Sequence, residues 1–450
     1  MARISLLNRR QALAGIGMAS LAATTAHAAA PLNAEDFGVI AALPDDQSKA
    51  MQAALDAAAA RGAELVLPAG AIFVRDLQLP GQVSIEGVPG ATQLTSRNGG
   101  RIARARNVSN LVLRHVGFDA RNAGTIEGDA LLDITGSLAV TLERCSFSSS
   151  PASALRITDS GVTVTNCDFA RHADAAIHAM DSRGLLISGN RISDCGNAGI
   201  RIWRSASGAD GSIITGNRIA KIDWRGGGNG QNGNGVNVFR ADEVIIADNH
   251  IADCAFSAIR LNATNNSRVS GNMCLRSGEV AVFSEFEFSG SVIANNIVDG
   301  AAAGISMTNL DSGGQLAVCS GNIVRNITPL SLVNPDTRPY GIAARADAAV
   351  TGNTVQNVPG VAISAGYGPF LRNVMISGNV VSTSNIGIAV SVVDGAGPVH
   401  IANNLISNAR DHAVVGMARR EIVEPDLITN ASRFANVTVG SVTVGNTPRS

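Results

Sequence analysis

The chain has 450 residues, of which 45% are hydrophobic and 16% are charged, so it can bury a large core and a disordered chain is excluded. Its 35 basic and 36 acidic residues nearly cancel, and this balance gives no overall attraction to nucleic acid or anionic lipid. No apolar run reaches about 18 residues, which excludes a membrane-spanning helix.

Residues 1–28 carry the pattern of an export signal. Arg9 and Arg10 precede a mild apolar stretch, and Ala26-His27-Ala28 provides a small-residue cleavage site. We therefore expect the twin-arginine translocase to export the protein to the periplasm or beyond. An ordinary signal peptide is the alternative, because Ala12 departs from the usual phenylalanine.

Residues 29–100 are expected to form an N-terminal cap and the first turns of a repeat that continues through residues 101–450. Asp45 and Asp46 stand before an alanine-rich stretch and can cap a helix there. The segment after about residue 420 should complete the last turns, so we expect no second globular domain.

One motif recurs along most of the chain. It reads apolar–x–Gly–Asn–x–apolar, then a variable turn, then Gly or Ala–apolar–x–apolar, as in Ile187 to Ile192 followed by Gly199 to Ile202. The central position of successive copies is held by Val116, Cys145, Cys167, Asn190, Asn217, Asn249, Asn272, Asn296, Asn322, Asn353, Asn379 and Asn404. The variable spacing indicates insertions in loops around a fixed core unit.

Short segments that alternate apolar and polar residues have the period of strands. Separated by Gly-Asn corners, they can wind as three short parallel strands per turn and stack turn on turn, with the asparagine side chains forming a ladder. The sequence therefore predicts an all-β fold, a single-stranded parallel β-helix made of three parallel sheets with a short N-terminal helical cap. A β-propeller is the alternative, but its blades need about 40 residues.

On these motifs, the chain resembles the right-handed parallel β-helix proteins of the pectin-lyase-like superfamily. The segment from Asp36-Phe37-Gly38 to Leu79-Pro80 resembles the helical entry cap of such proteins. The whole chain is also similar to a family of twin-arginine-translocated repetitive proteins whose activity is not established. The resemblance implies the fold, but this fold carries lyases, hydrolases, epimerases and non-catalytic adhesins.

Two insertions indicate a functional face. Asn217 to Gly235 and Asn322 to Gly341 are longer than the equivalent spans elsewhere, and both fall in the same turn of the repeat. They are four turns apart, or roughly 19 Å. We expect them to form two walls of a groove, with flat sheet as its floor.

Alternation along the strand after this turn predicts which side chains line the groove. Arg, Asn and aromatic residues suit a sugar acid, because rings stack on sugars, Arg pairs with carboxylates and Asn binds hydroxyls. The candidate substrate-binding residues are Arg201, Trp203, Trp224, Asn237, Arg240 and Asn262. The alternatives are solvated edge arginines and, for Trp224, a role in holding its own loop.

The catalytic candidates are Glu285, Glu287, Arg260 and Lys221. If Phe286 and Phe288 face inward, both carboxylates project from one face about 6.7 Å apart, which suits inverting glycoside hydrolysis. For β-elimination or C5-epimerisation, Lys221 could be the base and Arg260 could neutralise the substrate carboxylate. Exposed Arg260 and Glu285 should be replaceable without loss of stability.

We therefore expect a polysaccharide or cell-envelope glycan as partner, and either an enzyme or a non-catalytic glycan-binding protein. The polygalacturonase signatures and a pectate-lyase calcium cluster are absent. The histidines show no metal spacing, so no metal and no cofactor are expected. The six cysteines should be buried free thiols, with Cys145 and Cys167 the pair closest to a disulfide pattern.

Overall fold

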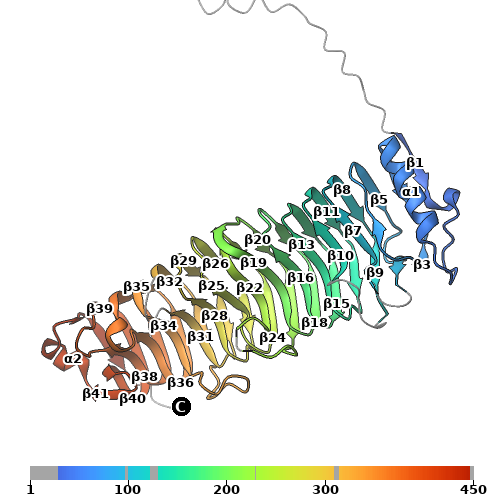
Figure 1. Cartoon of the computed structure of the whole chain (residues 1–450). Helices are drawn as coiled ribbons and strands as arrows, with labels where there is room; N and C mark the ends of the chain where they lie inside the picture. Colours follow the sequence, from blue (N-terminus) through green and yellow to red (C-terminus); the bar gives the residue numbers. More distant parts are fainter. Residues whose placement is uncertain (1–28, 97–99, 122–129, 229, 309–313, 446–450) are drawn as a thin grey trace, which may run out of the picture.

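The computed structural model describes residues 29–96, 100–121, 130–228, 230–308 and 314–445, and the predicted export signal in residues 1–28 lies outside them. These residues form a rod in which short parallel strands stack turn on turn (Figure 1). The turns between the two ends of the rod contribute strands to three faces, which we call sheets A, B and C. The predicted parallel β-helix is confirmed.

Sheet A contains the strands that precede the asparagine corner. Its 16 strands, in spatial order, are β1 (Ala29–Asn33), β2 (Ala63–Val66), β5 (Val83–Glu86), β8 (Ser109–Arg114), β11 (Leu138–Glu143), β14 (Val162–Thr165), β17 (Leu186–Ser188), β20 (Ile213–Thr215), β23 (Ile245–Ala247), β26 (Ser267–Ser270), β29 (Ser289–Ala294), β32 (Gln315–Ser320), β35 (Ala346–Thr351), β37 (Arg372–Ser377), β39 (Val399–Ala402) and β42 (Val437–Val439).

Sheet B follows the asparagine corner. It contains β3 (Gly70–Phe73), β6 (Thr92–Thr95), β9 (Gly117–Asp119), β12 (Ser146–Ser148), β15 (Asp168–His172), β18 (Arg191–Cys195), β21 (Arg218–Ile222), β24 (His250–Cys254), β27 (Met273–Leu275), β30 (Ile297–Asp299), β33 (Ile323–Arg325), the first parts of β36 (Thr354–Ala365), β38 (Val380–Ser391) and β40 (Asn404–Ala418), and β43 (Val442–Gly445).

Sheet C follows sheet B in each turn. It contains β4 (Leu77–Gln78), β7 (Ala103–Arg106), β10 (Ala130–Thr135), β13 (Ser153–Thr158), β16 (Ala175–Met180), β19 (Ala198–Ala209), β22 (Asn234–Asp242), β25 (Ile259–Asn262), β28 (Val280–Glu285), β31 (Ala303–Thr308), β34 (Tyr340–Ala344) and the second parts of β36, β38 and β40. Sheets B and C merge at β36, β38 and β40, because each of these strands runs through both faces.

Helix α1 (Ser48–Arg61) covers the N-terminal end of the rod (Figure 1). Its buried residues Met51, Ala54, Leu55 and Ala58 share one face and close the core. The N-cap position is held by Gln47 and not by Asp45 or Asp46 as predicted, but Asp46 still accepts the backbone N–H of Ser48 at 2.8 Å. A short 3-10 turn, η1 (Ala34–Phe37), precedes the helix.

The C-terminal end of the rod carries an antiparallel strand and a short helix. Strand β41 (Glu421–Glu424) turns back antiparallel to β40, and it is followed by α2 (Leu427–Asn430) and the 3-10 turn η3 (Ala431–Arg433). Another 3-10 turn, η2 (Gly368–Phe370), lies between β36 and β37. Strands β42 and β43 then add a further turn to sheets A and B.

The predicted asparagine ladder runs along the corner between sheets A and B. From Asn190 to Asn404, each side-chain N–H donates to the amide oxygen of the next asparagine at 2.9–3.0 Å. Cys167 continues the row, because its backbone N–H donates to Asn190 Oδ1 at 2.9 Å. The described cysteines, Cys145 and Cys167 included, are buried and free.

The residue before each asparagine must adopt a left-handed backbone. Gly271, before Asn272, has φ +69°, and a Cβ there would come within 2.4 Å of Asp248 Oδ1 from the preceding turn. This explains the Gly-Asn signature of the sequence, because glycine adopts a left-handed backbone without steric cost.

His172 lies inside the rod at the end of β15, 1% exposed, with its ring edge-on to Phe169. Burial, with a smaller effect from Arg171, lowers the pKa of His172 to about 3. His178 on sheet C behaves similarly, since burial lowers its pKa to about 4. Both imidazoles are therefore neutral in the folded protein at mildly acidic pH, where unfolded histidines are charged.

Because of these two histidines, we expect the unfolding free energy to decrease at acidic pH. Because the histidine pKa is lower in the folded state, the unfolding free energy is highest above the unfolded pKa of about 6.5. As the pH falls from there toward the folded pKa, the unfolding free energy decreases by up to about 1.4 kcal/mol per pH unit for each histidine. H172L should flatten the dependence of the unfolding free energy on pH between 6.5 and 4, measured by urea unfolding. H400L, a substitution of an exposed histidine on β39, should keep the wild-type slope. An unchanged slope in H172L would contradict this origin.

Candidate functional site

The two long insertions form the turns 223–233, between β21 and β22, and 326–339, between β33 and β34. Both join sheet B to sheet C, so they emerge at the same corner, as predicted. Both turns also contact sheet C directly. Asn232 accepts a hydrogen bond from Arg201 Nη2 at 2.8 Å, and Asn334 donates to Glu279 Oε1 at 2.7 Å. The floor that was expected to be open between the two turns is therefore partly covered by polar groups of the turns themselves.

The outward side chains of sheet C keep the predicted register. Arg201, Asn237, Arg260, Phe283 and Ser306 form one row of neighbouring residues. Trp203, Phe239, Asn262, Glu285 and Thr308 form the second row. Arg201, Asn237, Arg260 and Glu285 are nevertheless buried, which corrects the expectation that they are exposed.

A cleft of about 510 Å³ remains on this face, which we call the sheet C cleft. It crosses four neighbouring strands of sheet C and is bounded by residues of the 223–233 turn. Its lining residues are Met180, Trp203, Arg204, Ser205, Gly230, Gln231, Asn237, Phe239, Arg260 and Asn262. Four of the predicted site residues are thus brought together here: Trp203, Asn237, Arg260 and Asn262.

Two aromatic rings, those of Trp203 and Phe239, line the cleft. The Trp203 and Phe239 rings are 6.4 Å apart at an interplanar angle of 72°. The Trp203 indole N–H donates to Asn237 Oδ1 at 2.6 Å, which fixes the ring, and the Arg201 guanidinium lies 5.0 Å from its centroid. This arrangement presents a rigid aromatic surface flanked by polar groups.

Arg201 is held by an acidic partner that the sequence analysis did not identify. Its Nη1 contacts both carboxylate oxygens of Asp174 at 3.0 Å. Burial tends to raise the pKa of Asp174, but Arg201 and hydrogen bonds from Ser153 and Asn197 outweigh it and hold that pKa below its usual range. Arg201 therefore serves the architecture of the site more than the direct binding of a ligand.

Arg260 sits between two buried carboxylates. It donates to Glu285 from Nε at 2.6 Å and from Nη2 at 3.0 Å, and its Nη1 donates to Glu279 at 3.1 Å. Asn262 adds a hydrogen bond to Glu285 at 3.0 Å. The arginine that the sequence analysis assigned to a substrate carboxylate is thus already paired with carboxylates of the protein.

Glu279 was missed because it precedes its strand instead of lying in it. It occupies the turn directly before β28, as Asp174 does before β16. Each of these two residues binds an arginine on a neighbouring strand of sheet C. An acidic residue immediately before the Gly/Ala–apolar part of the repeat would have been the signal.

Glu285 and Glu287 do not share a face. Strand β28 ends at Glu285, and Phe286 has a left-handed backbone with φ +52° and is 57% exposed. Glu285 is buried whereas Glu287 is exposed. The predicted inward orientation of Phe286 is wrong, because the alternation ends where the strand turns, and with it the expected carboxylate pair about 6.7 Å apart along a strand.

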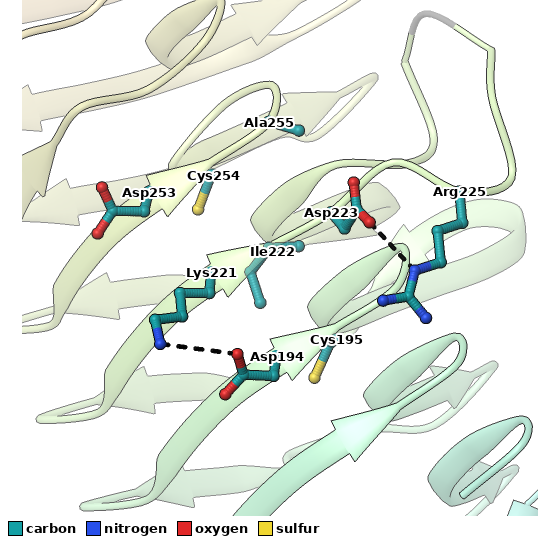
Figure 2. Close-up of a pocket in the computed structure, with 9 residues that line it drawn as sticks. All are labelled: Asp194, Cys195, Lys221, Ile222, Asp223, Arg225, Asp253, Cys254 and Ala255. Atoms are coloured by element: carbon teal, nitrogen blue, oxygen red, sulfur yellow. Dashed lines mark hydrogen bonds and ion pairs between the residues drawn. The ribbon is translucent and has the colours of Figure 1, made fainter.

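Lys221 lies in a second pocket, of about 450 Å³, at the corner between sheets B and C (Figure 2). It is 70% exposed, and its Nζ is 3.8 Å from Asp194 Oδ1 of the preceding turn. Asp253 of the following turn binds Arg276 at 2.6 Å. Lys221 therefore belongs to a row of alternating charges along the corner, and it lines a different pocket from Arg260.

The remaining candidates have structural contacts. Trp224 donates from its indole N–H to Gly228 O at 2.6 Å and packs on Phe256 with a centroid distance of 5.1 Å, so it holds its own turn. Arg240 covers the Phe239 ring at 4.7 Å and donates to Ser205 O at 2.9 Å. Arg240 thus lies beside the sheet C cleft, whereas Trp224 does not line it.

Arg204 is a cleft residue that the sequence analysis missed. One guanidinium nitrogen, Nη1, donates to Ser182 O at 3.3 Å, while its buried Nε finds no hydrogen-bond acceptor in the described part of the chain. Arg204 follows the last residue of the alternating pattern, so alternation could not place it. In the ranges that the structure covers, no cluster of three or more His, Cys, Asp or Glu residues could hold a metal ion.

A model of the right-handed β-helix region matches residues 104–229, and no curated protein matches the sequence. Tailspike protein 3 of bacteriophage CBA120 superposes with a TM-score of 0.53 at 12% identity over 91% of this chain, which spans 61% of the tailspike. An alginate lyase in complex with G6 superposes with a TM-score of 0.51 at 14% identity, covering 93% of this chain and 97% of the lyase. Identities this low show a shared fold.

Proposed function

We propose that this protein is exported to the periplasm or beyond and that it binds an acidic polysaccharide in the sheet C cleft. The observation that carries the proposal is the combination of the Trp203 and Phe239 rings with Arg204 in one cleft. Export rests on Arg9, Arg10 and the Ala26-His27-Ala28 site.

The aromatic surface favours a sugar as ligand. The apolar face of a pyranose ring stacks on an aromatic side chain, while amide groups bind its hydroxyls. Asn262 and Gln231 line the same cleft and supply such amides. A cleft that crosses four strands spans about 14 Å along the rod, which suits consecutive sugars of a chain.

The cations favour an acidic sugar. The half-buried Arg204 lines the cleft, and the exposed Arg240 lies next to the cleft on β22. Guanidinium groups bind carboxylates and sulfates through charge-assisted hydrogen bonds. The β-helix fold that this chain shares with an alginate lyase is compatible with this role.

Titration calorimetry with polygalacturonate oligomers tests the proposal. W203A should weaken binding about tenfold, because loss of the stacking surface costs about 1–2 kcal/mol. R204A should weaken binding and reduce its salt dependence. F370A, which removes a partly exposed ring in η2 away from the cleft, should bind as the wild type does. Equal affinity for neutral dextran, or unchanged binding by a folded W203A variant, would overturn the proposal.

Processing of the bound chain is the second candidate function. The observation that favours it is the pair of carboxylates, Glu279 and Glu285, joined through Arg260 to the cleft. Burial, with repulsion from Glu285, raises the pKa of Glu279 above its ordinary value despite Arg260 and Asn334. New reducing ends on incubation with acidic polysaccharides would indicate hydrolysis, and unsaturated uronide absorbance would indicate β-elimination. Binding with neither product leaves a non-catalytic glycan-binding protein.

A further inference from the structure

Glu279 lies behind the sheet C cleft, with Arg260 between the carboxylate and the cleft. Arg260 lines the cleft, and it donates from Nη1 to Glu279 and from Nε and Nη2 to Glu285. With both carboxylates ionised, the formal charges of this group are +1, −1 and −1, which leave a net charge of −1 in a buried site. An anionic ligand in the cleft competes with two carboxylates for one guanidinium.

We propose that the protein takes up a proton at Glu279 when an acidic glycan binds, so that affinity rises as the pH falls. This inference rests on the proposed function above. Negative charge next to Arg260 disfavours a second ionised carboxylate on the same cation. By linkage, a ligand that promotes protonation binds more tightly when protonation has already occurred.

Glu279 is the carboxylate that can lose its charge at lower cost. Glu285 accepts two hydrogen bonds from Arg260 and one from Asn262, whereas Glu279 accepts one from Arg260 and one from the neutral amide of Asn334. Charge-assisted hydrogen bonds are the stronger kind, so protonation of Glu279 sacrifices fewer of them. The burial of Glu279 also favours its protonated form, because it raises the pKa of the carboxyl.

The charged and titratable groups around Glu279 come from three strands. Arg260 faces it from β25, Glu285 from β28 and Tyr340 from β34, and Arg345, just after β34, interacts with Tyr340. The 326–339 turn contributes Asn334, and Ser331 of the same turn binds Gly278 O at 2.6 Å. Burial raises the pKa of Tyr340, so this phenol stays neutral where carboxylates titrate.

Titration calorimetry of the full chain with polygalacturonate oligomers, in two buffers of different ionisation enthalpy, measures proton uptake directly. In the wild type, affinity should rise by up to about tenfold per pH unit as the pH falls through the titration of Glu279, with uptake of up to one proton. E279Q should bind with a flatter pH dependence and without this uptake. Protonation of the ligand itself would affect both proteins equally.

A second variant keeps the test independent of E279Q. The amide of Asn334 stabilises the ionised form of Glu279, so N334A should raise the pKa of Glu279 and move proton uptake to higher pH. Wild-type uptake and slope in E279Q, or an unmoved midpoint in N334A, would overturn this inference while leaving glycan binding intact. Absence of binding by the wild type at every pH would instead overturn the proposed function together with it.

Discussion

Replacing Asn272 by alanine should lower the unfolding free energy by about 4 kcal/mol, because several buried polar groups lose their partners. Asn272 Oδ1 accepts both the side-chain and the backbone N–H of Asn249, at 2.9 and 3.1 Å. Its Nδ2 donates to Asn296 Oδ1 and to Ile246 O, each at 3.0 Å. All of these groups are inside the rod, where water cannot replace the lost bonds.

Urea unfolding and hydrogen exchange measure this effect. Exchange should accelerate most in the turns next to residue 272, because each turn of a solenoid contacts only its neighbours. Q356A provides the control, since Gln356 is an exposed amide on sheet B and its loss should change stability by less than about 0.5 kcal/mol. A cost for N272A as small as that of Q356A would show that the ladder does not hold the turns together.

Replacing Arg260 by alanine should cost about 3–5 kcal/mol of stability at neutral pH, because two buried carboxylates lose the cation that they share. The sequence predicted unchanged stability because position 260 was taken as exposed, but Arg260 is buried. The loss should shrink as pH falls. Without Arg260 the folded pKa of Glu279 rises further, because burial and repulsion from Glu285 are no longer opposed by the cation. A carboxyl whose folded pKa is raised destabilises the fold above that pKa, and the penalty disappears below the unfolded pKa.

A matched set of variants separates the charge effect from lost packing. R260M with E279Q and E285Q removes all three charges at similar volume and should recover most of the stability. R268A, which removes an exposed arginine on β26 of sheet A, should leave stability unchanged. Urea unfolding at pH 7 and pH 5 checks both expectations. A stable R260A variant with wild-type pH dependence would contradict the buried ion network.

The sequence alone determined the architecture, because the repeat is local. Glycine before asparagine indicates a left-handed backbone at the corner, and a spacing of one turn brings each asparagine next to the asparagine of the following turn. Alternation within a strand also placed Trp203, Asn237, Arg260 and Asn262 on one face correctly. Such predictions need only the period of the strand and the stacking of turns.

Only the tertiary structure decided what covers that face. Asn232 and Asn334 belong to irregular turns. Their local sequence does not predict that their side chains bind Arg201 and Glu279. The left-handed backbone at Phe286, which ends β28 and exposes Glu287, likewise interrupts a pattern that would otherwise continue. Alternation orients side chains within a strand, but the burial, pairing and charge of the site depend on contacts between turns distant in sequence.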